Sequence, residues 1–94
     1  MKEKRDILII EDDIDLSQML ASYLINSNYS VEIIHDPLKV LANLSTYTYK
    51  IILLDLTLPK MDGLVLCELI RQQHATPIII MSARDNVSDK VLGL

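Results

Sequence analysis

A chain of 94 residues that is 50% hydrophobic, with only two Gly and three Pro, can hold one hydrophobic core and is too apolar to stay disordered. Its formal charge of −4 at pH 7 excludes the basic field that direct binding of nucleic acid or of an anionic membrane requires. No apolar run approaches the roughly 20 residues of a membrane span and no signal peptide is recognisable, so the sequence predicts a cytoplasmic protein.

The first half of the chain predicts two strands and two helices. Residues 7–10 are apolar throughout, which is typical of a strand that helices cover on both faces. Residues 31–34 contain a charge and predict an edge strand. Asp36 and Pro37 suit the first turn of a helix marked by Leu38, Leu41 and Ala42. An earlier helix is predicted by the spacing i, i+3, i+4, i+7, i+8 of Leu16, Met19, Leu20, Tyr23 and Leu24.

The second half continues the alternation. Apolar residues 51–54 and 78–81 predict two more buried strands. Between them a helix is entered through Asp62 and Gly63, is marked by Leu66, Leu69 and Ile70, and closes before Pro77. A last helix starts near Asn86, with Val87 and Val91 on one side. This order predicts an α/β fold with an open parallel sheet and right-handed crossovers.

Acidic residues follow the predicted strands, at the edge of the sheet where such folds bind ligands. Glu11, Asp12 and Asp13 come after the first strand, Asp55 ends the third, and Ser82 ends the fourth. Because crowded carboxylates repel one another, the cluster favours a divalent cation such as Mg²⁺, which takes carboxylates, a carbonyl and waters. Asp12 and Asp55 are the expected carboxylate ligands, and the chain just beyond Asp55 the expected source of a carbonyl.

Asp55 is the best-placed nucleophile, because a carboxylate can attack a phosphoryl group whose charge is neutralised by a metal ion. Ser82 could then donate its hydroxyl to the new phosphoryl group. Each residue alone also has a structural interpretation: acids 11–15 as helix caps, Ser82 as a strand-end hydroxyl, and residues 58–63 as a turn. Their joint placement at neighbouring strand ends favours the site. His35, His74 and the lone Cys67 receive no chemical role.

Three segments carry a resemblance to a known family. Ile-Leu-Ile-Ile-Glu-Asp-Asp from Ile7, Ile-Ile-Leu-Leu-Asp-Leu-Thr-Leu-Pro-Lys-Met-Asp-Gly from Ile51 and Pro-Ile-Ile-Ile-Met-Ser-Ala-Arg from Pro77 resemble, in order and spacing, the receiver domains of bacterial two-component response regulators. The resemblance implies a flavodoxin-like, doubly wound parallel sheet. Residues 1–94 would be the N-terminal portion of a single receiver domain, with four strands in the order 2-1-3-4 and the fifth strand and helix missing.

The resemblance also implies residue roles. Asp55 looks like the phosphoacceptor, Asp12 like a direct Mg²⁺ ligand, and Glu11 like a ligand through water. Thr57 matches the position that offers a backbone carbonyl to the metal, and Ser82 the hydroxyl that turns toward the phosphoryl group. Three further positions match residues that leave the phosphoryl group accessible or shape the adjoining loop: Ala83, Pro59 and Gly63.

Partners follow from the same resemblance. The phosphoryl donor would be a phosphohistidine on a sensor histidine kinase, and the ending Asp-Lys-Val-Leu-Gly-Leu resembles regulators with a winged-helix DNA-binding domain, which implies a transcription-regulating output. Such proteins catalyse their own phosphorylation and dephosphorylation and are not turnover enzymes. A phosphatase of the haloacid dehalogenase type would need an Asp where this chain has Thr57.

The family's fifth strand carries a Lys that pairs with the phosphoryl group, and nothing in this sequence corresponds to it. The alternative function is therefore a dimerisation or interaction module that acts without phosphorylation. Without the fifth strand the fourth has an open edge, so we expect a homodimer, with exchange of elements as one form of it, or else a poorly stable monomer.

Overall fold

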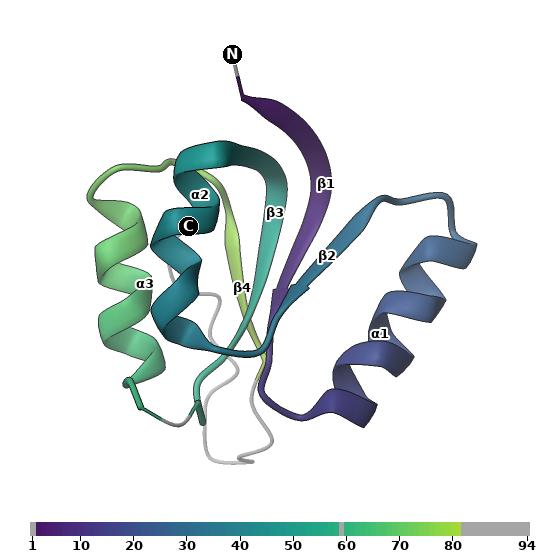
Figure 1. Ribbon diagram of the computed structural model, residues 1–94, viewed down its shortest axis with the longest axis horizontal. Coiled ribbons are helices and arrows are strands. Elements are labelled where there is room, and N and C mark those ends of the chain that lie inside the picture. The colour runs from purple at the N-terminus through teal and green to yellow at the C-terminus, as the bar shows by residue number, and fades with distance from the viewer. Residues whose placement is uncertain (1, 59, 82–94) are drawn as a thin grey trace.

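The computed structural model describes residues 2–58 and 60–81, and their centre is a parallel sheet. The strands are β1 (Glu3–Ile10), β2 (Val31–Ile34), β3 (Tyr47–Asp55) and β4 (Ile78–Met81). They lie in the order β2-β1-β3-β4, as expected, so β1 and β3 form the middle of the sheet (Figure 1). All three pairings are parallel, and every described strand therefore has its carboxyl end at the same edge.

Helices cover both faces of this sheet. Helix α1 (Ile14–Asn26) lies on one face, and α2 (Val40–Thr46) and α3 (Gly63–Arg71) lie together on the other (Figure 1). A short 3-10 turn, η1 (Pro37–Lys39), leads into α2; Asp36 caps it by accepting a hydrogen bond from the Leu38 N–H, with Pro37 in its first turn, as predicted. None of the helices in the described part of the chain is long and apolar enough to cross a membrane.

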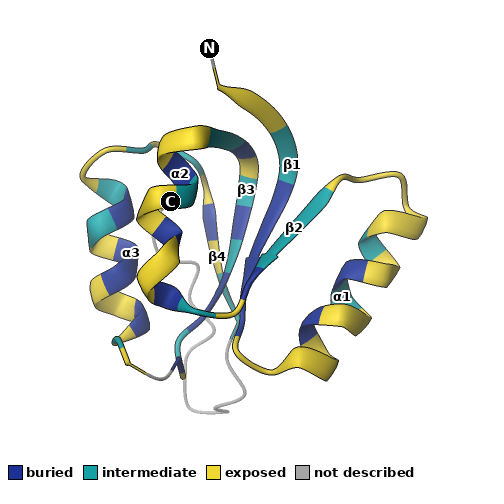
Figure 2. Ribbon diagram, viewed as in Figure 1, coloured by how far each residue is buried: buried dark blue, intermediate teal, exposed yellow. Residues whose placement is uncertain are grey.

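The main hydrophobic core lies between the sheet and the helix pair α2 and α3 (Figure 2). Fully buried side chains of the strands, such as Leu8 and Ile52, belong to one cluster with fully buried side chains of the helices, such as Val40 and Leu66. Cys67 of α3 is buried in this core. Burying these apolar surfaces supplies most of the driving force for folding.

Helix α1 forms as predicted, and Leu20 and Leu24 of its predicted apolar stripe pack against the core, but the buried face is shifted away from the rest of the stripe. Its buried residues are Ser17 and Ala21, whereas Met19 is 62% and Tyr23 72% exposed. The small side chains let the helix come close to the sheet, and the Ser17 hydroxyl is satisfied by the carbonyl of Ile14 at 2.9 Å. The apolar stripe is therefore turned partly toward solvent.

The expectation of strands covered on both faces holds for β1 and fails for β4. Ile7–Ile10 of β1 are all buried, and Val31–Ile34 forms the predicted edge strand beside it. By contrast Ile79 in β4 is 37% exposed. The physical reason is that α1, the only helix on that face among residues 2–58 and 60–81, packs over β1 and β2 and leaves β4 with little cover.

Candidate functional site

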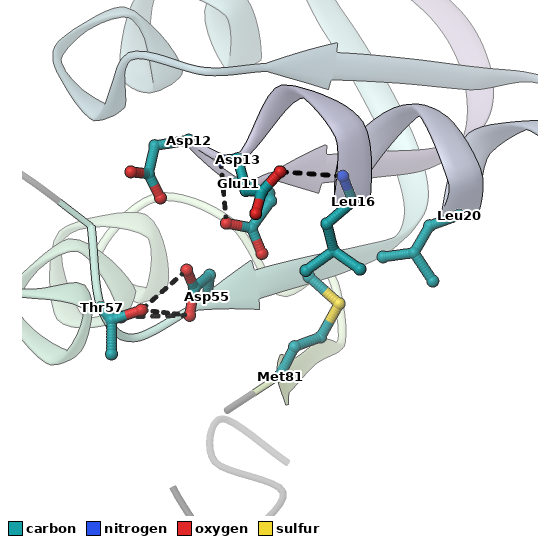
Figure 3. A pocket seen from close by; sticks show the side chains of 8 residues that line it. All are labelled: Glu11, Asp12, Asp13, Leu16, Leu20, Asp55, Thr57 and Met81. Carbon is teal, nitrogen blue, oxygen red and sulfur yellow. Dashed lines mark hydrogen bonds between the residues drawn. The ribbon is translucent and has the colours of Figure 1, made fainter. Parts of the chain in front are cut away.

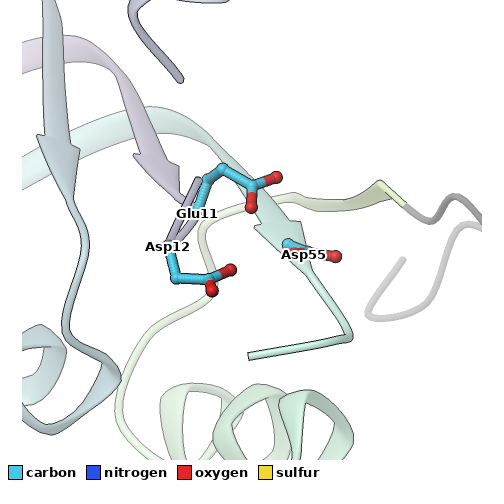
Figure 4. Close-up of side chains that lie close together, drawn as sticks. All are labelled: Glu11, Asp12 and Asp55. Carbon is cyan, nitrogen blue, oxygen red and sulfur yellow. The ribbon is translucent and has the colours of Figure 1, made fainter. Parts of the chain in front are cut away.

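Three of the four acids that the sequence placed together, Glu11, Asp12 and Asp55, meet at the carboxyl edge of the sheet. The β1–β3 register aligns Ile10 with Leu54, so Glu11 and Asp55 follow on neighbouring strands. One carboxylate oxygen from each of Glu11, Asp12 and Asp55 lies within 4.8 Å of the others (Figure 4). Strands that are far apart in the sequence thus bring these acids into one cluster, which we call the acid cluster.

The members of the acid cluster differ in burial. Glu11 is 3% and Asp55 6% exposed, whereas Asp12 faces solvent. Burial foremost, together with the neighbouring carboxylates of Asp55 and Asp12, raises the pKa of Glu11 to about 7 against the lowering effect of the Asp13 N–H. Positive charge placed nearby would favour the ionised form of this carboxyl group. The donor set therefore fits a hard divalent cation, which prefers oxygen ligands.

Asp13 belongs to the helix rather than to the acid cluster. Its side chain accepts a hydrogen bond from the Leu16 N–H at 2.9 Å and caps α1, and its own N–H donates to Glu11 Oε2 at 3.1 Å. The structural interpretation of the acidic run is thus correct for Asp13, and the functional interpretation fits its neighbours. Asp12 stands between the two and has its carboxylate free to point at Asp55 (Figure 4).

Thr57 touches the proposed phosphoacceptor with its side chain. Its hydroxyl lies 3.0 Å from both Asp55 carboxylate oxygens, and its N–H donates to Asp55 Oδ1 at 3.1 Å (Figure 3). Sequence reasoning gave Thr57 only a backbone role and missed this contact. The signal was present, because a Thr two residues after an Asp is a common partner in local side-chain turns.

The loop after Asp55 returns to the sheet through Gly63. A Cβ at this position would lie 2.7 Å from Leu56 Cα and 3.0 Å from the Asp55 carbonyl oxygen, so only glycine fits without movement. Asp62 caps α3 by accepting a hydrogen bond from the Leu64 N–H at 2.8 Å. The start of α3 is thereby packed directly against the backbone of Asp55 and Leu56. Pro59 lies outside the described residues.

His35, which the sequence left without a role, also reaches this edge. Its Nδ1 lies 3.0 Å from the backbone carbonyl oxygen of Glu11, although the ring is on an exposed residue. No pattern in the sequence predicts a contact between a side chain and a distant backbone carbonyl. His74, the other histidine, lies in the connection from α3 to β4 at the opposite edge of the sheet.

The acid cluster forms one side of a cleft of about 540 Å³ (Figure 3). The other side is apolar and comes from Leu16 and Leu20 of α1 and Met81 of β4. Asp55 is aligned with Met81 in the β3–β4 pairing. Ser82 is the next residue in the sequence after Met81. Ser82, Ala83 and the predicted helix from Asn86 with Val87 and Val91 lie outside the described residues.

Comparisons with known proteins agree with this geometry. The model of the response regulator receiver domain family matches residues 7–94. Response regulator ArlR of Staphylococcus aureus is 43% identical over 88 residues, which are 94% of this chain and 40% of that protein. The chain thus spans about two fifths of the length of the curated relatives it matches.

Solved structures give the same result. The receiver domain of the Francisella response regulator 1452 has a TM-score of 0.82 and 28% identity, covering 95% of this chain and 74% of that one. The BeF3-activated N-terminal receiver domain of Klebsiella pneumoniae RstA has a TM-score of 0.84 and 26% identity, covering 97% and 76%. With the strand order and the acid cluster, these matches show that the chain belongs to the family of response regulator receiver domains.

Proposed function

We propose that this chain accepts a phosphoryl group on Asp55 from a phosphohistidine of a sensor histidine kinase. The observation that carries the proposal is the acid cluster, in which the buried Asp55 lies at the tip of a central strand with the carboxylates of Glu11 and Asp12 beside it. Family membership supports the choice of partner. We further propose that residues 1–94 are the N-terminal portion of one receiver domain that works in the cytoplasm.

Mg²⁺ is the proposed cofactor of this site. Asp12 and Asp55 would bind it directly, Glu11 would act through a water molecule, and Thr57 would offer its backbone carbonyl. The charge of three neighbouring carboxylates supports this assignment, because their mutual repulsion is relieved by a cation. When bound, Mg²⁺ would offset the negative charge that develops on the transferred phosphoryl oxygens.

The residues of the chain then perform the transfer. An Asp55 carboxylate oxygen attacks the phosphorus, an O–P bond forms, and the P–N bond to the imidazole breaks. The electron pair of that bond goes to the leaving imidazole nitrogen, which takes up a proton. Thr57 orients the attacking carboxylate through its N–H and hydroxyl. Ser82 is proposed to donate its hydroxyl to the new phosphoryl group, and Ala83 to leave room for it.

Intact mass measurement after incubation with acetyl phosphate and Mg²⁺ tests the proposal. We expect the chain to gain one phosphoryl group, and we expect no gain for Asp55→Asn or when the metal is chelated. Asp15→Asn is the matched control, because Asp15 is an exposed acid in the first turn of α1 outside the acid cluster. Its mass gain should equal that of the unaltered chain. Phosphorylation of Asp55→Asn to the same extent would contradict the proposal.

The output is proposed from the family and from the relatives' length. Because the chain spans 40% of ArlR, a further domain of the whole protein would read the phosphorylation state. We propose a winged-helix DNA-binding domain, and hence transcription regulation, on the resemblance of residues 89–94 to that subgroup. The negative charge of this chain fits a role without DNA contact of its own.

We also propose that two copies of the chain associate, with exchange of elements as one form. The observation in favour is the outer edge of β4, which pairs with no strand among the described residues and carries the exposed Ile79. Association independent of phosphorylation is the alternative function. Sedimentation of the unaltered chain before and after phosphorylation, and of the Asp55→Asn variant, separates this alternative from the phosphorylation-dependent function. The alternative requires a dimer that forms without phosphorylation and that Asp55→Asn does not change.

A further inference from the structure

Two hydrogen bonds join the backbone of Glu11 to the carboxyl end of β2. The Glu11 N–H donates to the Ile34 carbonyl at 3.1 Å, and the Glu11 carbonyl oxygen lies 3.0 Å from His35 Nδ1. A carbonyl oxygen can only accept, so Nδ1 carries the hydrogen in this contact. Both backbone groups of Glu11 are thus bound to consecutive residues of a neighbouring strand end.

The His35 contact acts on the peptide that leads into Asp12. The Glu11 carbonyl and the Asp12 nitrogen share one rigid peptide plane, so a bond to that oxygen fixes the orientation from which the Asp12 backbone starts. On the far side, Asp13 is fixed as the cap of α1 by the Leu16 N–H at 2.9 Å. Asp12 is therefore held between two anchored points, while its own side chain is exposed and has no hydrogen bond among the described residues.

We infer that His35 is a positioning residue for the acid cluster, which holds the Glu11–Asp12 peptide so that the exposed Asp12 carboxylate stays within reach of Asp55. The inference rests on the proposed Mg²⁺ site. His35 itself donates no ligand atom, and it acts through the backbone of its neighbour. Outer groups that orient metal ligands contribute measurably to metal affinity.

A matched set of variants separates positioning from general stability. His35→Ala removes the donor. His35→Asn keeps one, because the Asn amide nitrogen is attached to Cγ as Nδ1 is in histidine. His35→Gln also keeps an amide but places it one bond farther from the backbone. His74→Ala is the control, since His74 lies at the opposite edge of the sheet.

The test is a calorimetric titration of the unaltered chain and of each variant, all spanning residues 1–94, with Mg²⁺ at one fixed pH. We expect His35→Ala and His35→Gln to weaken Mg²⁺ binding about three- to tenfold, which is the effect of one lost hydrogen bond. His35→Asn should restore affinity to within about twofold, and His74→Ala should leave it unchanged. In phosphorylation by acetyl phosphate, His35→Ala should raise the Mg²⁺ concentration for half-maximal rate and leave the rate at saturating Mg²⁺ unaltered.

The possible results distinguish a failure of the proposed function from a failure of the inference alone. If the unaltered chain binds no Mg²⁺, the proposed function and the inference both fail. If it binds Mg²⁺ and His35→Ala binds equally well, the inference alone fails. Equal weakening in Ala and Asn variants, together with a lowered melting temperature of the metal-free protein, would show a merely structural role and also overturn it. Should His35→Ala not fold, the Asn and Gln variants still decide the matter.

Discussion

The Thr57 hydroxyl lies 3.0 Å from both carboxylate oxygens of Asp55, so one side chain engages both atoms that could attack a phosphoryl group. The Thr57 N–H adds a third contact at 3.1 Å. Asp55 ends β3, and within residues 2–58 and 60–81 the hydrogen bonds to its carboxylate all come from Thr57, so Thr57 orients this side chain.

Thr57→Val keeps the shape of the side chain and removes its hydroxyl. We expect phosphorylation by acetyl phosphate to slow about three- to tenfold, as expected for one hydrogen bond that orients the nucleophile. Thr57→Ser retains the hydroxyl and should stay within about twofold of the unaltered rate. The rates are measured by intact mass over time at saturating Mg²⁺. A valine variant as fast as the serine variant would contradict an orienting role.

The raised pKa of Glu11 predicts how the stability of the metal-free protein depends on pH. With a pKa of about 7 in the folded chain against 4.5 for the free group, the folded state holds the proton more tightly than the unfolded state. The contribution of protonated Glu11 to the free energy of unfolding is therefore fully present below pH 4.5, falls as the pH rises toward 7, and is absent above that pH. The total loss is on the order of 3 kcal/mol at most.

Urea unfolding across this pH range in the absence of metal measures the effect. Glu11→Gln cannot ionise and should show a flatter pH profile between 4.5 and 7, with higher stability than the unaltered chain above that range. Mg²⁺ should raise the stability of the unaltered chain most at the alkaline end, where Glu11 is ionised. Identical pH profiles for the two proteins would contradict the assignment.

The order of elements and the acid cluster were predictable because both depend on short-range signals. Apolar runs located the strands, and parallel strands bring their carboxyl ends to one edge. The strand order that the family resemblance implied makes the first and third strands neighbours, so Glu11, Asp12 and Asp55 were expected near one another. Asp36 and Asp62 were readable as helix entries for the same reason, since each caps a helix with its own side chain.

Other features depend on contacts that have no local signature. Strand β1 begins at Glu3 rather than at the apolar run, because Arg5 stacks 3.9 Å above the Tyr47 ring and pairs with Glu32 from the edge strand. The buried face of α1 follows Ser17 and Ala21, which hydrophobicity alone would not select. The link between His35 and the Glu11 carbonyl joins residues 24 positions apart and involves a backbone atom.

A reciprocal contact between Asp6 and Ser30 predicts a stability effect in acid. The Asp6 carboxylate accepts from the Ser30 N–H at 2.8 Å, its own N–H donates to the Ser30 hydroxyl at 2.9 Å, and Lys50 lies 3.2 Å away. The Ser30 N–H foremost, and Lys50 next, hold the pKa of Asp6 below its usual value. A lowered pKa stabilises the fold above pH 3.8 and is lost as pH falls through the folded pKa.

Asp6→Ala should therefore lower the urea midpoint at neutral pH, and its difference from the unaltered chain should shrink as the carboxylate is protonated. Lys50→Ala is the matched control for the ion pair, and because Lys50 is 81% exposed it should change the midpoint little. If the urea midpoints of Asp6→Ala and the unaltered chain differ by the same amount at neutral and acidic pH, the charge of Asp6 contributes nothing to stability.

The close approach of Gly63 to the backbone of Asp55 and Leu56 predicts that a single methyl group disturbs both the fold and the acid cluster. In Gly63→Ala the new Cβ would meet Leu56 Cα at 2.7 Å, and because that atom is backbone, α3 or the loop after Asp55 must move. We expect a loss of about 1–3 kcal/mol in urea unfolding, as for other overpacked positions. Leu64→Ala, at the next residue of α3 with a 45% exposed side chain, should cost less. Because the displaced backbone carries Asp55 and Thr57, Gly63→Ala should also weaken Mg²⁺ binding, whereas Leu64→Ala should not. If Gly63→Ala is destabilised but keeps full Mg²⁺ affinity, the loop adjusts without moving the acid cluster, and the predicted effect on the site is wrong.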